Sequence, residues 1–238
     1  MSIRVGFDVD GVIANFNKTF RDTAAQIEGR TGEDPSTPAT RGLGAEAMKR
    51  VWDHISRTPQ WWLQLEAYEP EQIERIYRTS RARRWEVYFM TTRPSSAGET
   101  TQFQTQWWLE SHRFPMPAVL TVPGSRGDAA NALKLDITVD DRLTNCVDVI
   151  AASRSKAVLV LRREDQTVRD QALARGIGVV STLAAAIDAV EQFEEARRTS
   201  AGRLSRLADW FKPSKHDEER LPMDARATLG RVDPPPKA

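Results

Sequence analysis

Short apolar runs typical of buried β-strands alternate along this chain with segments of helical pattern. The runs expected to form strands lie at residues 3–9, 85–90, 118–122, 136–140, 157–161 and 177–180. Helical patterns lie at 16–29, 45–56, 71–83, 98–111, 128–134, 143–153, 166–175 and 182–198. This alternation requires parallel strands joined by crossover helices. The sequence therefore predicts an α/β fold, a Rossmann-like three-layer sandwich with a parallel sheet.

The segment between the first two strong strand patterns is too long for a single crossover helix. Residues 16–71 contain helical patterns and no convincing strand, so we expect a small helical cap inserted after the first strand. Residues 1–15 and 72–198 are expected to form the α/β core. The composition of residues 199–238 is charged and rich in proline, which predicts a mostly disordered C-terminal tail.

Composition excludes several classes of protein. The formal net charge is +1, which gives no strong sign of a nucleic-acid partner. The single cysteine, Cys146, excludes an intramolecular disulfide framework and a cysteine-based zinc cluster. No apolar run approaches the length of about 20 residues that spans a bilayer, and the N-terminal run is too short for a signal peptide. We therefore expect a cytoplasmic protein with a small-molecule partner and no membrane partner; a homodimer is compatible with the sequence.

Acidic and hydroxyl side chains stand where three of the predicted strands end. They are the pairs Asp8 and Asp10, Thr91 and Thr92, and Asp140 and Asp141. Ligands of parallel sheets bind beyond the carboxyl ends of the strands. Because the crowded carboxylates of Asp8 and Asp10 repel each other, a divalent cation is the simplest compensation, and Mg²⁺ prefers carboxylate oxygens and water. The sequence predicts a magnesium site at Asp8 and Asp10, completed by Asp140 or Asp141.

Three motifs in this order resemble those of the haloacid dehalogenase (HAD) superfamily of phosphohydrolases. The motifs are Phe7-Asp8-Val9-Asp10-Gly11-Val12, Phe89-Met90-Thr91-Thr92 and Ile137-Thr138-Val139-Asp140-Asp141. The resemblance covers about residues 3–160 and implies a HAD-like core. It also implies that Asp8 is a nucleophile that forms an aspartyl-phosphate, and that Asp10 protonates the leaving alkoxide and then deprotonates water.

The resemblance further implies how metal and phosphate are bound. Mg²⁺ would bind Asp8, the backbone carbonyl of Asp10, and Asp140 or Asp141. The hydroxyl of Thr91 and the backbone at Thr92 would bind phosphate oxygens.

The superfamily also places a cationic side chain, usually lysine, against the phosphate and the nucleophile. Lys134 is the first candidate, although it lies only six residues before Asp140, closer than in relatives of this kind. The alternative for Lys134 is an exposed lysine at a helix end. Arg126 and Arg93 are the substitutes, and this departure puts the third motif of the family in doubt.

Within the superfamily, the chain most resembles the 5′(3′)-deoxyribonucleotidase group. The resemblance rests on Phe16 after the second aspartate, the pair Trp61-Trp62 before a proline-initiated helix, the small helical cap and the paired Asp140-Asp141. It implies that Phe16, Trp61 and Trp62 surround a nucleobase, since flat bases stack on aromatic faces. The alternative is that these aromatic side chains form the apolar core of the cap.

The predicted function is therefore a Mg²⁺-dependent phosphomonoester hydrolase, specifically a 5′-nucleotidase acting on (deoxy)nucleoside monophosphates. One alternative is a HAD phosphatase for another small phosphorylated metabolite. Another is a catalytically weak relative that binds a phosphorylated ligand. The presence of both Asp8 and Asp10 favours an enzyme, whereas the departure at the third motif favours the binding protein.

Overall fold

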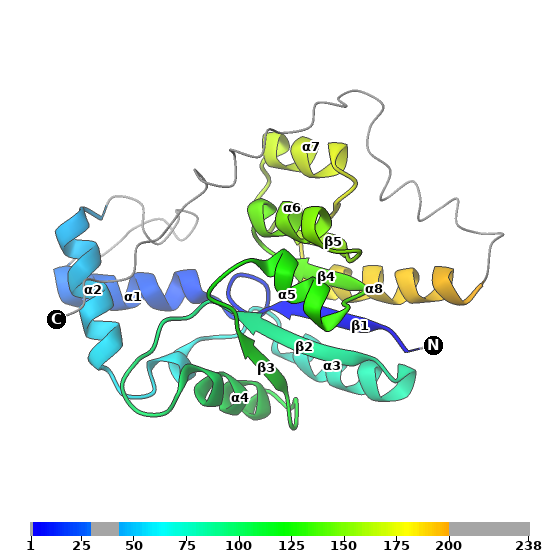
Figure 1. The fold of residues 1–238 in the computed structure, drawn as a ribbon. Helices are drawn as coiled ribbons and strands as arrows, with labels where there is room; N and C mark the ends of the chain where they lie inside the picture. Colours follow the sequence, from blue (N-terminus) through cyan, green and yellow to red (C-terminus); the bar gives the residue numbers. More distant parts are fainter. Residues whose placement is uncertain (1, 30–42, 200–238) are drawn as a thin grey trace.

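A parallel six-stranded sheet forms the centre of the molecule, in the strand order β3-β2-β1-β4-β5-β6 (Figure 1). The computed structural model describes residues 2–29 and 43–199. The strands are β1 Arg4–Asp8, β2 Glu86–Thr91, β3 Ala118–Thr121, β4 Ile137–Asp140, β5 Lys156–Val160 and β6 Gly178–Val180. This is the strand order of a doubly wound fold, in which the direction of winding reverses between β1 and β4. The predicted α/β fold is confirmed.

Helices cover both faces of this sheet. They are α1 Phe16–Glu28, α2 Ala45–Arg57, the 3₁₀ helix η1 Trp61–Gln64, α3 Pro70–Arg83, α4 Thr101–Ser111, α5 Arg126–Leu133, α6 Leu143–Ala152, α7 Gln166–Ala174 and α8 Leu183–Arg198. Apolar side chains of α3, α4 and α8 join one core cluster, and those of α5, α6 and α7 join a second. Each cluster fills one side of the sheet, which gives the three layers seen in Figure 1.

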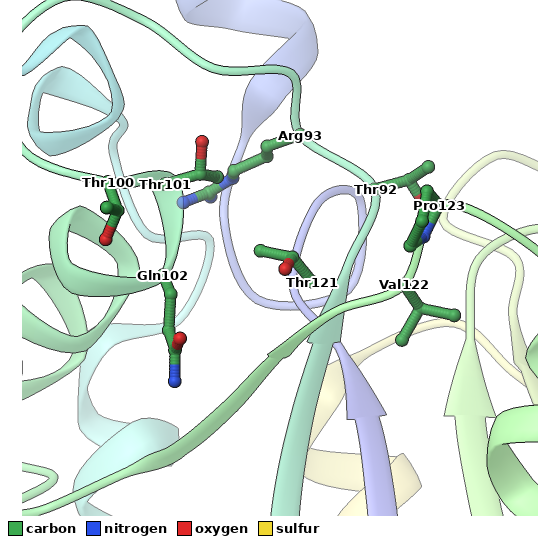
Figure 2. A pocket seen from close by; sticks show the side chains of 8 residues that line it. All are labelled: Thr92, Arg93, Thr100, Thr101, Gln102, Thr121, Val122 and Pro123. Atoms are coloured by element: carbon green, nitrogen blue, oxygen red, sulfur yellow. The ribbon is translucent and has the colours of Figure 1, made fainter.

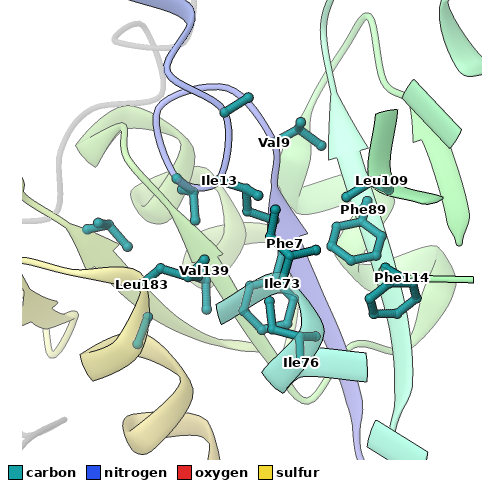
Figure 3. Close-up of a cluster of buried hydrophobic side chains, with 14 of the residues drawn as sticks. Phe7, Val9, Ile13, Ile73, Ile76, Phe89, Leu109, Phe114, Val139 and Leu183 are labelled. Carbon is teal, nitrogen blue, oxygen red and sulfur yellow. The ribbon is translucent and has the colours of Figure 1, made fainter. Parts of the chain in front are cut away.

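The period-two pattern of the strands sends alternate side chains into these two clusters. Phe7 and Phe89 enter the first cluster, and Phe89 packs edge-on against Phe114, with ring centroids 4.8 Å apart (Figure 3). Met90, the neighbour of Phe89, enters the second. Because successive side chains of a strand point to opposite faces, this double burial fixes the strand register. Asp8 pairs with Met90 in that register, so the ends of β1 and β2 lie level.

The chain between β1 and α3 forms α1, α2 and η1, and its described part contains no strand. Its two connections to the core are hydrogen-bonded to each other: Asn15 N donates to Glu66 O over 2.8 Å, and Tyr68 N donates to Ile13 O over 2.9 Å. The helical content agrees with the predicted cap. Residues 30–42 of the predicted cap, and residues 200–238 of the predicted tail, lie outside the described residues. In the described ranges no helix is both long and apolar enough to cross a membrane.

Candidate active site

The tip of β1 forms the floor of the candidate site. Asp8 is the last residue of β1 and is buried. The chain then turns sharply, with Ile13 N and Ala14 N both donating to Val9 O. Gly11 allows this turn because its φ is 91° and because a Cβ there would overlap the carboxylate of Asp141. The turn keeps Asp10 at the same edge of the sheet as Asp8, and Asp141, which follows β4, packs against Gly11.

A buried arginine contacts the candidate nucleophile. Nη2 of Arg126 donates to Oδ1 of Asp8 over 2.6 Å and to Oγ1 of Thr92 over 3.0 Å. Arg126 is 4% exposed; its buried Nε and Nη1 atoms make no hydrogen bond among the described residues, although Nε forms a longer ion pair with Asp140 Oδ2 over 3.8 Å. Buried donors without partners are costly in a folded protein. Arg126 therefore brings to the tip of β1 a guanidinium whose hydrogen-bonding capacity is not fully used.

Helices α5 and α6 together hold Arg126 in place. Arg126 is the first residue of α5, and the side chain of Ser125 caps that helix by accepting from Asp128 N. Asp148 of α6 accepts from Ser125 Oγ over 2.7 Å and from Gly127 N over 2.9 Å. A Cβ at Gly127 would overlap the backbone of Asp148, so glycine permits the close approach of the two helices.

A second buried arginine, Arg93, forms a bidentate ion pair with Asp10. Arg93 Nη2 lies 2.7 Å from Asp10 Oδ1, and Nε lies 2.9 Å from Oδ2. Thr91 Oγ1 also donates to Asp10 Oδ2, over 3.0 Å. Nη1 of Arg93 donates to Thr105, and the guanidinium lies over the ring of Trp62, 4.9 Å from its centroid. These contacts fix the direction of the Asp10 carboxylate, since a paired arginine fork restricts both oxygens.

Negative charge is crowded at this edge of the sheet. Burial, and then repulsion from Asp140, raise the pKa of Asp8 well above its usual value, although Arg126 opposes the shift. Burial, and then repulsion from Asp140, raise the pKa of Asp141 to about 7. Burial also raises the pKa of Asp140, while hydrogen bonds from Arg142 N and Asn145 oppose this. The site therefore holds more buried carboxylate than its arginines balance, which suits an added cation.

The carboxylates at the tips of β1 and β4 are compatible with a Mg²⁺ ion that keeps part of its water shell. Among the described residues, no three acidic, histidine or cysteine side chains are grouped so that they could hold a metal ion. Mg²⁺ does not need such a cage, because it retains waters and is held by one or two carboxylates together with substrate oxygens. Asp8 and Asp141, with the backbone carbonyl of Asp10, would be a set of this smaller kind.

The two threonines at the end of β2 have different partners. Thr91 is buried; its hydroxyl donates to Asp10 and accepts from Arg93 N. Thr92 is exposed, and its hydroxyl accepts from Arg126. The structure thus directs the side chain of Thr92, rather than that of Thr91, toward the place where an anion would bind Arg126.

The structure corrects the choice of Lys134 as the phosphate-site cation. Lys134 is exposed and ends α5, immediately before β4. It therefore lies at the amino-terminal edge of the sheet, where Asp136 N donates to Arg4 O at the start of β1. Asp8 lies at the opposite edge. Arg126, at the other end of α5, occupies the position that was predicted for Lys134.

The structure also corrects the predicted base pocket. Trp61 and Trp62 are each 1% exposed, so neither offers a free ring face to a base. Their ring nitrogens are already paired, with Trp61 donating to Thr23 and Trp62 donating to Pro94 O. Phe16 is partly buried and stacks against Trp62. The alternative interpretation of these side chains, as core of the cap, fits the structure.

We expect Trp62→Ala to lower the free energy of unfolding by about 3–5 kcal/mol, as large-to-small core changes do. Chemical denaturation measures this. The matched control is Trp107→Ala on α4, where we expect a smaller loss because Trp107 is 41% exposed. A Trp62→Ala protein of unchanged stability that binds nucleotides more weakly would instead support the base pocket.

A pocket of about 380 Å³ opens beside the site, between the ends of β2 and β3 and the start of α4 (Figure 2). We call it the β2–β3 pocket. Its lining residues are Thr92, Arg93, Thr100, Thr101, Gln102, Thr121, Val122 and Pro123. Thr92 belongs both to this pocket and to the surroundings of Arg126, so the two spaces adjoin.

Two supporting residues were not identified from the sequence. Asn145 donates to both carboxylate oxygens of Asp140, over 3.0 and 3.1 Å. Arg162, which follows β5, donates to the carbonyls of Gly11 and Val12 over 3.0 and 2.6 Å and so holds the turn after β1. Asn145 lies in the first turn of α6, the helix that follows Asp140, and this position in the sequence could have indicated that it contacts Asp140. Arg162 follows a strand end, but nothing in the sequence indicates its partners.

Comparison with known proteins identifies the fold. The scan against protein-family models and the search of curated proteins find no match. Among solved structures, the chain is similar to a predicted phosphatase from Clostridium acetobutylicum, with a TM-score of 0.53, 13% identity and coverage of 83% of this chain and 99% of that chain. It is also similar to a HAD-family hydrolase from Deinococcus radiodurans R1 with bound phosphate and sodium, with a TM-score of 0.51, 15% identity and coverage of 90% and 99%.

A hydrolase from Pseudomonas syringae is similar to the same degree, with a TM-score of 0.51, 12% identity and coverage of 81% of this chain and 99% of that chain. The chain therefore has the fold of the HAD-family hydrolases and phosphatases. At these identities the likeness establishes the fold, and the reaction has to be argued from the residues of the site.

Proposed function

We propose that this protein is a Mg²⁺-dependent phosphomonoester hydrolase of HAD type. One observation carries the proposal: the buried guanidinium of Arg126 contacts both Asp8 and Thr92 and keeps two nitrogens, Nε and Nη1, that make no hydrogen bond among the described residues. Arginine binds phosphate oxygens well because its planar fork of N–H groups matches them. A phosphate bound there would lie against a carboxylate that can attack phosphorus. The phosphate named in the similar D. radiodurans structure supports the same chemistry.

The proposed reaction has two steps. An Oδ atom of Asp8 forms a bond to phosphorus while the bond from phosphorus to the alcohol oxygen breaks, and that oxygen takes a proton from Asp10. Water then forms a bond to phosphorus and gives its proton to Asp10, while the bond between phosphorus and Asp8 breaks. The products are the alcohol and inorganic phosphate, and Asp8 is regenerated. Arg93 and Thr91 fix the direction of the Asp10 carboxylate in which these proton transfers would take place.

Asp8, the backbone carbonyl of Asp10, and Asp140 or Asp141 would hold Mg²⁺. When bound, the ion supplies positive charge that offsets repulsion between the carboxylates and the phosphate. Asp141 is the better placed of the last two, because Asp140 already accepts hydrogen bonds from Arg142 N and Asn145. Arg126 contributes the fixed positive charge that Lys134 was predicted to supply.

The nucleotidase specificity implied by the sequence resemblance is a competing alternative for the alcohol part of the substrate. It rests on Phe16 and on the helical insertion, because Trp61 and Trp62 are enclosed. Nucleoside monophosphates therefore belong in a substrate panel alongside other small phosphate esters.

We expect the purified chain to release phosphate from at least one ester of this panel with Mg²⁺, to lose this activity with a chelator and to regain it when Mg²⁺ is restored. Mg²⁺ alone should also raise the unfolding temperature, because a ligand at 100 times its Kd stabilises the folded state by about 2.7 kcal/mol. Asp141→Asn should reduce that shift, whereas the matched change Asp170→Asn on exposed α7 should not.

Two outcomes would count against the proposal. Full turnover in the chelator would exclude the metal. Turnover of no phosphate ester, with inorganic phosphate still bound, would favour the phospholigand-binding alternative.

A further inference from the structure

The β2–β3 pocket adjoins the place where the phosphate is proposed to bind. Thr92 belongs to both places. It lines the pocket, and its hydroxyl accepts from Arg126 Nη2, the nitrogen that also donates to Asp8. In Figure 2, Thr92 and Thr100 stand on opposite sides of the pocket, with Thr121 between them. The rest of a phosphate ester bound at Arg126 thus has a space beside it.

The lining of this pocket carries little free charge. Arg93 is the one charged side chain among its eight lining residues, and its guanidinium is engaged by Asp10 and Thr105. A second phosphate or a carboxylate on the substrate would therefore enter without a charged partner, which is costly. The eight residues include no aromatic side chain, so a base would find no stacking face there.

The polar groups of the lining both donate and accept. Thr100 Oγ1 already accepts from Phe103 N, so its hydrogen can still be donated. Gln102 Nε2 donates to Val119 O, so its oxygen can still accept. The hydroxyl of Thr121 makes no hydrogen bond to any residue within 2–29 and 43–199 and can do both. This mixture matches alcohol hydroxyls, which themselves donate and accept.

The β2–β3 pocket is small and partly apolar. The volume of about 380 Å³ is at the small end of ligand pockets, which range over roughly 300–1,000 Å³. Val122 and Pro123 supply an apolar wall suited to the C–H faces of a carbohydrate ring or chain.

We propose that the β2–β3 pocket binds the alcohol part of the substrate, and that this part is a small, uncharged, polyhydroxylated group. The substrate class is then the monophosphate esters of sugars and polyols. This inference rests on the proposed phosphatase function and specifies its substrate.

The test compares sugar and polyol monophosphates with nucleoside monophosphates and with sugar bisphosphates, using the full chain with Mg²⁺. We expect the first class to have the highest kcat/KM, by about tenfold or more, which is a typical discrimination for a shaped pocket. Thr121→Tyr fills the pocket and should raise KM for the preferred ester by about tenfold. The same variant should leave the inhibition constant of inorganic phosphate within about twofold, because phosphate occupies only the Arg126 site.

Thr167→Tyr is the matched control, because it makes the same change at an exposed position of α7; it should retain the wild-type KM. Val122→Phe fills the pocket from the next position and guards against a folding defect specific to Thr121→Tyr. Preference for nucleotides or bisphosphates, or a KM insensitive to both filling variants, would overturn the pocket assignment alone. Failure of the wild-type protein to hydrolyse any ester would reject the phosphatase function and this inference with it.

Discussion

Asp8→Asn is expected to abolish phosphate release, lowering kcat by at least about 10⁴-fold, as loss of a covalent nucleophile does in other hydrolases. An amide in place of the carboxylate does not form the acyl phosphate on which the proposed reaction depends. Steady-state phosphate release from the best ester of the panel measures the effect. Asp170→Asn, an exposed change of the same chemistry, is the control and should retain full activity.

A measurement of the unfolding temperature of the Asp8→Asn protein distinguishes a loss of catalysis from misfolding. The surroundings of Asp8 disfavour its ionised form, as its raised pKa shows, and an asparagine oxygen can still accept from Arg126. Because relief of the buried charge and loss of the ion pair with Arg126 oppose each other, we expect the Asp8→Asn protein to remain folded, with an unfolding temperature close to that of the wild type at neutral pH. Wild-type turnover in a well-folded Asp8→Asn protein would exclude the covalent mechanism.

Arg126→Met is expected to lower kcat/KM by about 10²–10³-fold, comparable to the loss of one fixed donor that stabilises transition-state charge. Methionine keeps part of the stem and removes every guanidinium donor. The inhibition constant of inorganic phosphate should rise in parallel, because the proposed site has Arg126 contacting phosphate both before and after the reaction. Arg126→Lys should recover part of the activity, since the charge returns without the planar fork.

Lys134→Met is the matched control for Arg126, because it removes the cation that the sequence analysis preferred. We expect its activity to stay within about twofold of wild type, as for a surface change away from the site. Arg126→Met should also reduce stability at neutral pH, since it leaves the buried Asp8 without its charged partner. A large loss in Lys134→Met together with an active Arg126→Met protein would reverse the assignment.

The position of the acidic residues was predictable from the sequence for a simple physical reason. Asp8 and Asp140 each end an apolar run, and the carboxyl ends of parallel strands meet at one edge. The same rule also distinguishes Arg126 from Lys134. Arg126 follows β3 and must lie at that edge, whereas Lys134 precedes β4 and must lie at the other. The choice of Lys134 followed the residue type usual in the family and overlooked its place relative to the strands.

Side-chain partners were harder to predict. An aromatic pair such as Trp61-Trp62 has the same sequence pattern whether its side chains line a pocket or fill a core. Its enclosure depends on segments that are distant in sequence. The ring nitrogen of Trp62 donates to Pro94 O, 32 positions away, and its backbone N donates to the side-chain oxygen of Gln104, 42 positions away. The clamp of Arg93 on Asp10 likewise joins residues 83 positions apart.

The sequence by itself determined the α/β layers, the parallel sheet and the edge at which Asp8, Asp10 and Asp140 gather, because periodicity and strand ends are local properties of the chain. Only the tertiary structure decided that Arg126 pairs with Asp8, that Arg93 holds Asp10, that Trp61 and Trp62 are enclosed, and that a pocket opens beside Thr92. Each of these depends on how side chains from different elements fill a shared space, and packing of that kind leaves no periodic trace in the sequence.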